Sequence, residues 1–141
     1  LASHPLMRAL RVDKITIAGL HATLNAYERQ TALSEIPIWR MISMTVDELH
    51  ARAVTIQAYF GDEVQIVPSM AAVGGGSLPG ATMPSVALQL KSDQPNDLAK
   101  RLRMGEPAVV ARIENNHVLL DLRSVLPEHD ELVVEAIKLV R

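Results

Sequence analysis

The chain has 141 residues, 48% of them hydrophobic, and its 14 Lys and Arg residues nearly balance its 16 Asp and Glu residues. This length suits a single domain with its own hydrophobic core. The net charge of -2 argues against nonspecific binding to nucleic acid or to an anionic membrane. Because the chain has no cysteine, disulfides, thiolate metal sites and cysteine nucleophiles are excluded.

No apolar run reaches the roughly 18 residues that a transmembrane helix needs, and no signal segment opens the chain. We therefore expect a cytoplasmic protein without a membrane span. The first residue is Leu1 rather than Met, so we also expect the chain to be part of a longer protein.

The first third of the sequence predicts helices. Over residues 14–30, apolar residues recur at the spacing of one helix stripe, with Asp13 placed to cap the N-terminus. These apolar residues are Ile17, Leu20, Leu24 and Tyr27. Pro37 rules out one long helix over residues 31–44. Thr45 and Glu48 have the spacing of a capping box, which predicts a second helix that ends at Gly61.

The second half mixes strands and helices. Alternation of polar and apolar residues predicts strands, and a basic segment closed by Gly105 predicts a short helix. Asn115 and Asn116 tolerate positive φ, which favours a tight hairpin. The expected elements are strands at 63–68 and 85–91, a helix at 95–104, strands at 108–113 and 117–123, and a last helix from Pro127.

This order of elements predicts an α+β fold with a mostly antiparallel sheet packed against helices on one face. Short strands are interspersed with helices, and no regular strand-helix alternation or internal repeat is present.

Most familiar catalytic patterns are missing from the sequence. The five histidines lack the spacing of metal-binding motifs, and no serine stands in a GxSxG elbow. The glycine cluster at 74–80 lacks the features of a phosphate-binding loop, so the simpler interpretation is a loop that needs positive φ or a close backbone approach.

The segment MRALRVDK at residues 7–14 is the most suggestive. Arg8, Arg11 and Lys14 are three residues apart, so on a helix they would share one face. Two guanidinium groups at this spacing suit a tetrahedral oxyanion. A solvated basic face explains the same spacing equally well.

The stretch from His4 to Leu24, which contains RALRVDK, resembles bacterial selenocysteine synthase, also called L-seryl-tRNA(Sec) selenium transferase. The resemblance continues in the same order through further blocks and covers essentially the whole chain. These blocks are IPIWRMI at 36–42, VPSMAAVGGGSLPGATMPSVAL at 67–88 and LRMGEPAVVARIENNHVLLDLRSVLPEHDE at 102–131.

The resemblance implies a fold-type I pyridoxal-phosphate enzyme of the bacterial cytoplasm, working as a homo-oligomer built from dimers. Such an enzyme converts seryl-tRNA(Sec) to selenocysteinyl-tRNA(Sec) with selenophosphate as donor. The cofactor acts as electron sink while water is eliminated to a dehydroalanyl intermediate, to which selenium adds.

The resemblance also implies a division of the chain. Residues 1–30 would be the helix region that connects to a large domain, and residues 31–141 the small C-terminal domain. Arg8 and Arg11 match the family's two arginines that hold the selenium-donor anion. The family's cofactor lysine lies upstream of the RALRVDK block, so Lys14 is not expected to form the Schiff base, and the chain alone is expected to be inactive.

Two alternatives remain at this point. One is a related pyridoxal-phosphate lyase or aminotransferase, in which Arg8 and Arg11 bind a substrate carboxylate or phosphate. The other is a binding or oligomerisation module without enzymatic activity. The resemblance favours the selenium transferase.

Overall fold

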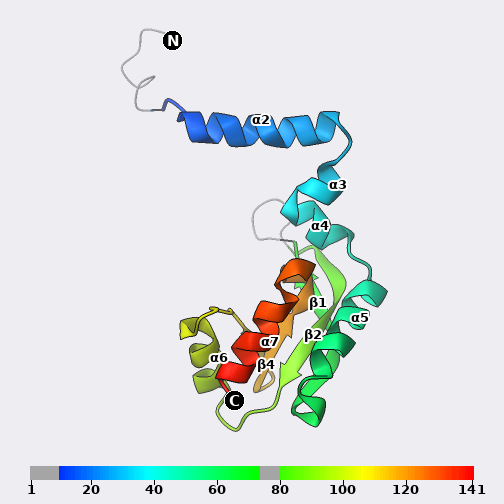
Figure 1. The fold of residues 1–141 in the computed structure, drawn as a ribbon, viewed down its shortest axis with the longest axis vertical. Helices are drawn as coiled ribbons and strands as arrows, with labels where there is room; N and C mark the ends of the chain where they lie inside the picture. Colours follow the sequence, from blue (N-terminus) through cyan, green and yellow to red (C-terminus); the bar gives the residue numbers. More distant parts are fainter. Residues whose placement is uncertain (1–9, 74–79) are drawn as a thin grey trace. The chain divides into compact units, whose positions relative to one another are not determined.

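The computed structural model describes residues 10–73 and 80–141 (Figure 1). The chain divides into two compact units, Leu1–Arg40 and Met41–Arg141. The N-terminal unit contains α2 (Lys14–Glu28), α3 (Ala32–Glu35) and the start of α4 (Pro37–Ser43).

Helix α2 confirms the predicted helix and its cap. Asp13 is the N-cap, and the helix ends at Glu28, two residues earlier than predicted. Gln30, at a φ of 59°, turns the chain toward α3. The side chains of Tyr27 and Trp39 are joined by a hydrogen bond from the Trp39 indole Nε1 to the Tyr27 hydroxyl.

The C-terminal unit contains the sheet and the remaining helices. In chain order its elements are α5 (Val46–Gln57), η1 (Gly61–Glu63), β1 (Val64–Ala72), β2 (Thr82–Leu90), α6 (Pro95–Met104), β3 (Arg112–Glu114), β4 (His117–Asp121), η2 (Leu122–Ser124), η3 (Pro127–His129) and α7 (Asp130–Leu139).

The four strands form one antiparallel sheet in the order β1-β2-β4-β3. The predicted α+β class is therefore confirmed. Asn115 and Asn116, at φ values of 49° and 63°, join β3 to β4 in the tight turn that the sequence predicts. The capping box of Thr45 and Glu48 at the start of α5 is also confirmed.

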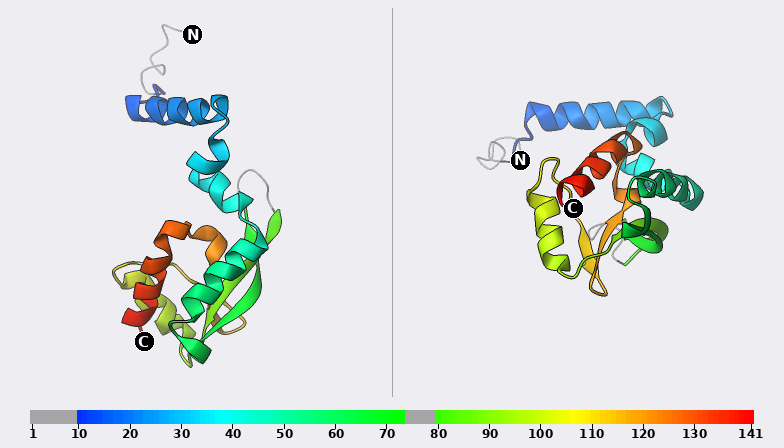
Figure 2. Two further views of the ribbon diagram at one scale, coloured as in Figure 1. Left: turned by 45° about the vertical axis from the view of Figure 1, so that its right-hand side comes forward. Right: turned by 60° about the horizontal axis from the view of Figure 1, so that its bottom comes forward.

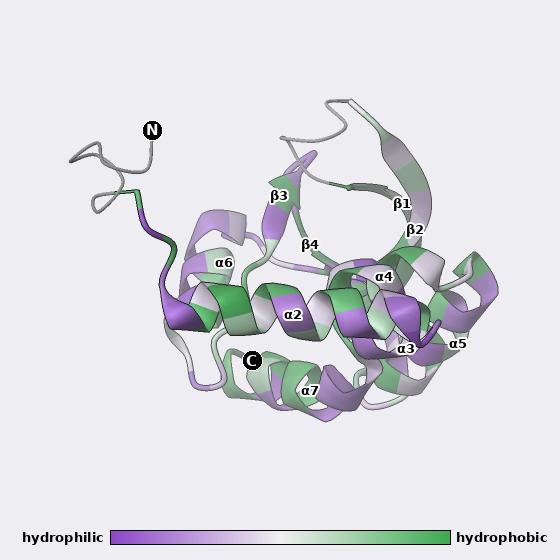
Figure 3. Cartoon of the chain, turned by 90° about the horizontal axis from the view of Figure 1, so that it is seen from above, coloured by the Kyte–Doolittle hydropathy of each residue, from purple (hydrophilic) through white to green (hydrophobic). Residues whose placement is uncertain are grey.

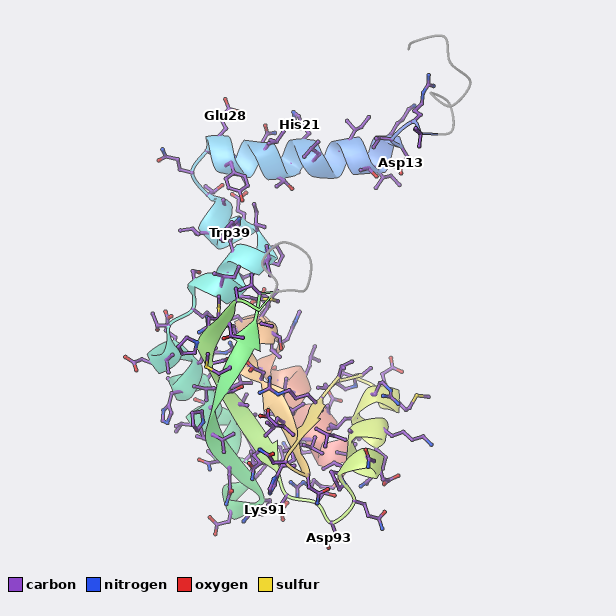
Figure 4. The ribbon with its side chains drawn as sticks, turned by 180° about the vertical axis from the view of Figure 1, so that it is seen from behind. Asp13, His21, Glu28, Trp39, Lys91 and Asp93 are labelled. Atoms are coloured by element: carbon purple, nitrogen blue, oxygen red, sulfur yellow. The ribbon has the colours of Figure 1, made fainter. Side chains whose placement is uncertain are left out.

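Helices α5, α6 and α7 cover one face of the sheet, as the core contacts show. Figure 1 views the unit from the side of α7, whereas Figure 4 views it from the side of the open sheet face. The second view in Figure 2 shows the same layering end-on. The fully buried large side chains of this core are Leu49, Ile56, Val64, Leu88, Leu90, Leu102, Val118, Leu122 and Ile137.

The boundaries of several elements differ from the prediction because hydrogen bonding to other segments, and not the alternation of polar and apolar residues, determines them. Strands β1 and β2 extend to Ala72 and Thr82 because they pair with each other along their whole length. Conversely, residues 108–111 lie outside β3, and the Val109 amide donates to the Leu102 carbonyl of α6 instead of to a strand. Helix α5 ends at Gln57, and Gly61, at a φ of 56°, begins the turn η1 instead of ending the helix.

Two arginines, the partly buried Arg52 and the buried Arg123, connect elements that are distant in the sequence. Arg52 of α5 makes a paired contact with the Asp130 carboxylate at the start of α7, at 2.9 and 2.6 Å. Arg123, only 6% exposed, donates from Nη1 to the carbonyls of Met41, Ile42 and Met44, and from Nη2 to that of Pro84. Arg123 thereby ties the end of α4 to strand β2.

None of the helices in the described part of the chain is both long and apolar enough to cross a membrane.

Replacing Arg123 by Met should lower the free energy of unfolding by at least about 2 kcal/mol, because several backbone carbonyls lose their donor in a buried place. Arg103→Met, at an exposed position of α6, should stay within about 0.5 kcal/mol of the wild type. Urea denaturation followed by circular dichroism measures both. Equal stability of the two variants would contradict the role given to Arg123.

Candidate functional site

The N-terminal segment holds the arginines that the sequence singles out. Arg11 lies in a non-helical stretch two residues before the N-cap Asp13, and its side chain is exposed. Arg8 lies outside the described residues. Within the described part of the chain, Arg11 has neither an ion pair nor a side-chain hydrogen bond, so all the donors of its guanidinium are available to an anion.

The shared helix face predicted for Arg8, Arg11 and Lys14 is wrong for the two cations that the structure describes. Helix α2 begins at Lys14, so Arg11 and Asp13 are both outside it. Asp13 causes this start, because its side chain accepts hydrogen bonds from the Thr16 amide at 2.8 Å and the Thr16 hydroxyl at 3.1 Å. A capping residue needs extended backbone, which prevents the helix from continuing back to Arg11.

These hydrogen bonds also control the charge beside Arg11. The bond from the Thr16 amide, and then that from its hydroxyl, lower the pKa of the Asp13 carboxyl below its ordinary value of 3.8. Asp13 is therefore ionised at neutral pH and partly balances Arg11 and Lys14. An anion bound here needs more positive donors than Arg11 alone supplies.

The open face of the sheet contains a groove of about 600 Å³ that the sequence did not predict. Strands β1, β2, β3 and β4 all contribute to its lining. The groove is lined by Val67, Pro68, Ser69, Met70, Gln89, Arg112, Glu114, Asn115, His117 and Leu119.

Arg112 is the central residue of this groove. From edge strand β3 it donates to the Ser69 hydroxyl at 2.8 Å and to the Met70 carbonyl at 3.2 Å, both on the opposite edge strand β1. The sheet must therefore curl so that its two edges approach each other (Figure 3). The Glu114 carboxylate lies 3.2 Å from the same guanidinium.

A cluster of hydroxyl and carboxylate groups completes this network. Asp121 accepts from Ser69 at 2.7 Å and from Ser85 at 2.6 Å, and it lies 4.0 Å from Arg112. With two carboxylates near one guanidinium, the groove has no excess positive charge. Its polar groups stabilise the curled sheet and do not form an anion site.

Of the three cations at the basic end of the 95–104 helix, Arg101 has a structural role. Arg101 is paired with Asp97 at 3.0 Å and donates to the Val140 carbonyl at 2.6 Å, so it fastens α6 to the end of α7. Lys100 and Arg103 are exposed. In the glycine loop, Gly80 has the expected positive φ, at 82°, while residues 74–79 lie outside the described residues.

Metal binding finds no support in the ranges 10–73 and 80–141. No group of three or more His, Asp or Glu side chains there could hold a metal ion. His21, His50, His117 and His129 are all exposed, and His4 lies outside these ranges.

The Asp13 cap makes a pH-dependent prediction. Because its folded-state pKa is lowered, the cap stabilises the start of α2 fully above about pH 4, and this stabilisation is lost as the pH falls through the folded pKa. An NMR titration of the Thr16 amide should therefore give a midpoint below 3.8. Asp13→Asn, which can still cap, should abolish the transition without unwinding the first turn. A midpoint at or above 3.8 would contradict this account of the cap.

Comparison with known proteins identifies relatives for nearly the whole chain. The family model described as L-seryl-tRNA selenium transferase matches residues 1–126. An L-seryl-tRNA(Sec) selenium transferase of Moorella thermoacetica is 36% identical over 97% of this chain, and one of Proteus mirabilis is 38% identical over 96%. Another, of Aquifex aeolicus, is 32% identical over 91%.

The chain spans about a third of the length of these relatives, between 29% and 32%. Because the family model includes the RALRVDK segment, the α5 helix and the sheet up to η2, the match does not depend on one motif. The chain belongs to the L-seryl-tRNA selenium transferase family.

Proposed function

We propose that the chain is the C-terminal part of an L-seryl-tRNA(Sec) selenium transferase. The full-length enzyme would convert seryl-tRNA(Sec) to selenocysteinyl-tRNA(Sec), taking selenium from selenophosphate and releasing phosphate. The observation that supports this best is the unbroken family match over residues 1–126. We further propose a cytoplasmic enzyme built from dimers, in which the 141-residue chain alone is inactive.

In this proposal Arg8 and Arg11 hold the donor. Selenophosphate is a small tetrahedral polyanion, and guanidinium groups bind such anions through several N–H donors at once. The exposed, unpaired side chain of Arg11 within the described residues supports this role. The serine carboxyl is esterified to tRNA and carries no charge, so the arginines have no substrate carboxylate to bind.

The described residues do not fit a pyridoxal-phosphate cradle. A cofactor lysine needs an enclosed site, yet Lys14, Lys91, Lys100 and Lys138 are all exposed. Lys138 stacks on the Tyr59 ring at 4.9 Å from its centre. Lys14 begins α2. We therefore place the cofactor, its lysine and the elimination chemistry in the part of the enzyme that this chain does not span.

The donor role predicts a selective kinetic defect. In the full-length enzyme, Arg11→Ala and Arg8→Ala should each raise the KM for selenophosphate at least about tenfold, since each removes a charge-assisted contact of about 1.4 kcal/mol or more. The absorbance of the bound cofactor should not change.

Arg103→Ala, which removes an exposed cation far along the sequence, serves as the matched control and should leave the KM for selenophosphate unchanged. If both arginine variants of the N-terminal segment keep the wild-type KM, the donor role is wrong.

The position of the cofactor lysine is a separate prediction. Borohydride reduction of the full-length protein, followed by peptide mass spectrometry, should find the pyridoxyl group on a lysine outside these 141 residues. A pyridoxyl label on Lys14, or the complete lack of a label, would contradict the proposed placement of the cofactor.

A further inference from the structure

The residues just before α2 favour a helix by composition, yet Leu10 and Arg11 are not helical. Residues 7–11 are Met, Arg, Ala, Leu and Arg, which are all among the strongest helix formers. Helix α2 nevertheless begins only at Lys14. A local constraint at the start of α2 must therefore outweigh the intrinsic helix preference of the segment that carries Arg11.

Asp13 supplies this constraint at the start of α2 (Figure 4). Both oxygens of its carboxylate bind Thr16: Oδ1 accepts from the Thr16 amide at 2.8 Å, and Oδ2 accepts from the Thr16 hydroxyl at 3.1 Å. The Asp13 carbonyl accepts from the Ile17 amide at 3.2 Å, which is the first hydrogen bond of the helix. The backbone of Asp13 itself is extended, with φ at -73° and ψ at 166°. Because all these partners lie on the first turn of α2, the cap needs no contact with the rest of a full-length protein.

The first consequence concerns the backbone of Arg11. In an extended chain successive residues rise by about 3.3 Å and point to opposite sides. In a helix they rise by about 1.5 Å and turn by roughly 100°. If α2 continued backwards through Asp13, the Arg11 guanidinium would therefore move and point in another direction.

The second consequence concerns the charge of Arg11. A carboxylate two residues from an arginine is close enough to compete with a bound anion for its guanidinium. Here both oxygens of Asp13 are held by Thr16. Arg11 has neither an ion pair nor a side-chain hydrogen bond in the part of the chain that the structure describes. The cap thus directs its own carboxylate into the helix and away from Arg11.

We propose that Asp13 is a positioning residue for the donor site, because it starts α2 at Lys14 and so holds Arg11 in non-helical backbone with an unpaired guanidinium. This role rests on the proposed binding of selenophosphate by Arg11. Asp13 does not contact the donor itself. The start of the helix is not the anion site either, because the Asp13 carboxylate already takes the Thr16 amide.

NMR of the 141-residue chain tests the effect on the backbone without any donor. In Asp13→Ala, which cannot cap, the Cα chemical shifts of Leu10, Arg11 and Val12 should move toward helical values. In Asp13→Asn, which still caps, these shifts should stay as they are in the wild type. Unchanged shifts in both variants would overturn the proposal, because Asp13 would then not set the backbone of Arg11.

The same two substitutions separate the cap from the charge in the kinetics of the full-length enzyme. Both remove the negative charge, so the comparison between them reports the cap alone. The KM for selenophosphate should be about fivefold higher in Asp13→Ala than in Asp13→Asn, with the same kcat. In Asp13→Asn the KM should not exceed that of the wild type, since losing a nearby negative charge favours an anion. Equal KM values in the two variants would overturn the proposal.

Thr45 provides a matched control for the loss of a cap. Its side chain accepts from the Glu48 amide at 3.2 Å at the start of α5, in the other compact unit. Thr45→Ala removes a cap of the same kind and should leave the KM for selenophosphate unchanged. A rise as large as that in Asp13→Ala would indicate general destabilisation and would rule out a positioning role.

A double-mutant cycle shows whether Asp13 acts through Arg11. In an Arg11→Ala background, Asp13→Ala and Asp13→Asn should have the same KM for selenophosphate, because the group that the cap positions is gone. A difference that persists without Arg11 would overturn the positioning role. The failure of the donor role is a distinct result: Arg11→Ala alone would then keep the wild-type KM.

Discussion

The Arg123 guanidinium is the contact on which the C-terminal unit depends most. Its two terminal nitrogens donate to the carbonyls of Met41, Ile42 and Met44, where α4 ends, and to Pro84 on β2. The last carbonyls of a helix have no hydrogen-bond partner within the helix, and a cation at that end also interacts favourably with the helix dipole. Because Met41 begins the unit, Arg123 fixes the point where the chain enters it. Burying this guanidinium has an energetic cost, because its Nε is buried without a hydrogen-bond partner among the described residues.

Polar side chains determine the helix angles and the sheet curvature, which the apolar core alone does not fix. Arg52 and Asp130 hold the start of α7 to α5. On the opposite face of the sheet, Arg112 joins β3 to β1, while Asp121 collects the hydroxyls of Ser69 and Ser85. Hydrophobic burial is nondirectional, so it cannot choose one curvature or one helix angle. Hydrogen bonds with fixed geometry make that choice, and the curled sheet follows from Arg112.

The sequence predicted correctly those features that are determined by neighbouring residues, namely helix caps and a tight turn. The Asp13 cap, the Thr45 and Glu48 box and the Asn115-Asn116 turn each involve residues at most three apart, and all are confirmed. The lengths of β1 and β2, and the loss of strand pairing at 108–111, depend on partners far away in the chain. The groove around Arg112 could not be predicted for the same reason, since Ser69 and Arg112 are 43 residues apart. At the candidate site, the sequence pointed to Arg11 and also predicted the Asp13 cap. A helix that begins after Asp13 cannot contain Arg11, so the shared helix face considered for the cations was incompatible with that cap.

The charges around Arg11 explain why a donor site would need more than this chain. Asp13 stays ionised at neutral pH because Thr16 lowers its pKa, so it offsets one of the two nearby cations, Arg11 and Lys14. A polyanion such as selenophosphate needs a clear excess of positive donors before binding outweighs its desolvation. Arg8 would add one such donor, and the remaining part of a full-length relative, about two thirds of its length, would have to add the rest. A segment that presents arginines to a site formed elsewhere must be held in place by residues other than those arginines. The apolar side chains of Ile17, Leu20, Leu24 and Tyr27 on α2, which begins directly after this segment, are suited to that structural role.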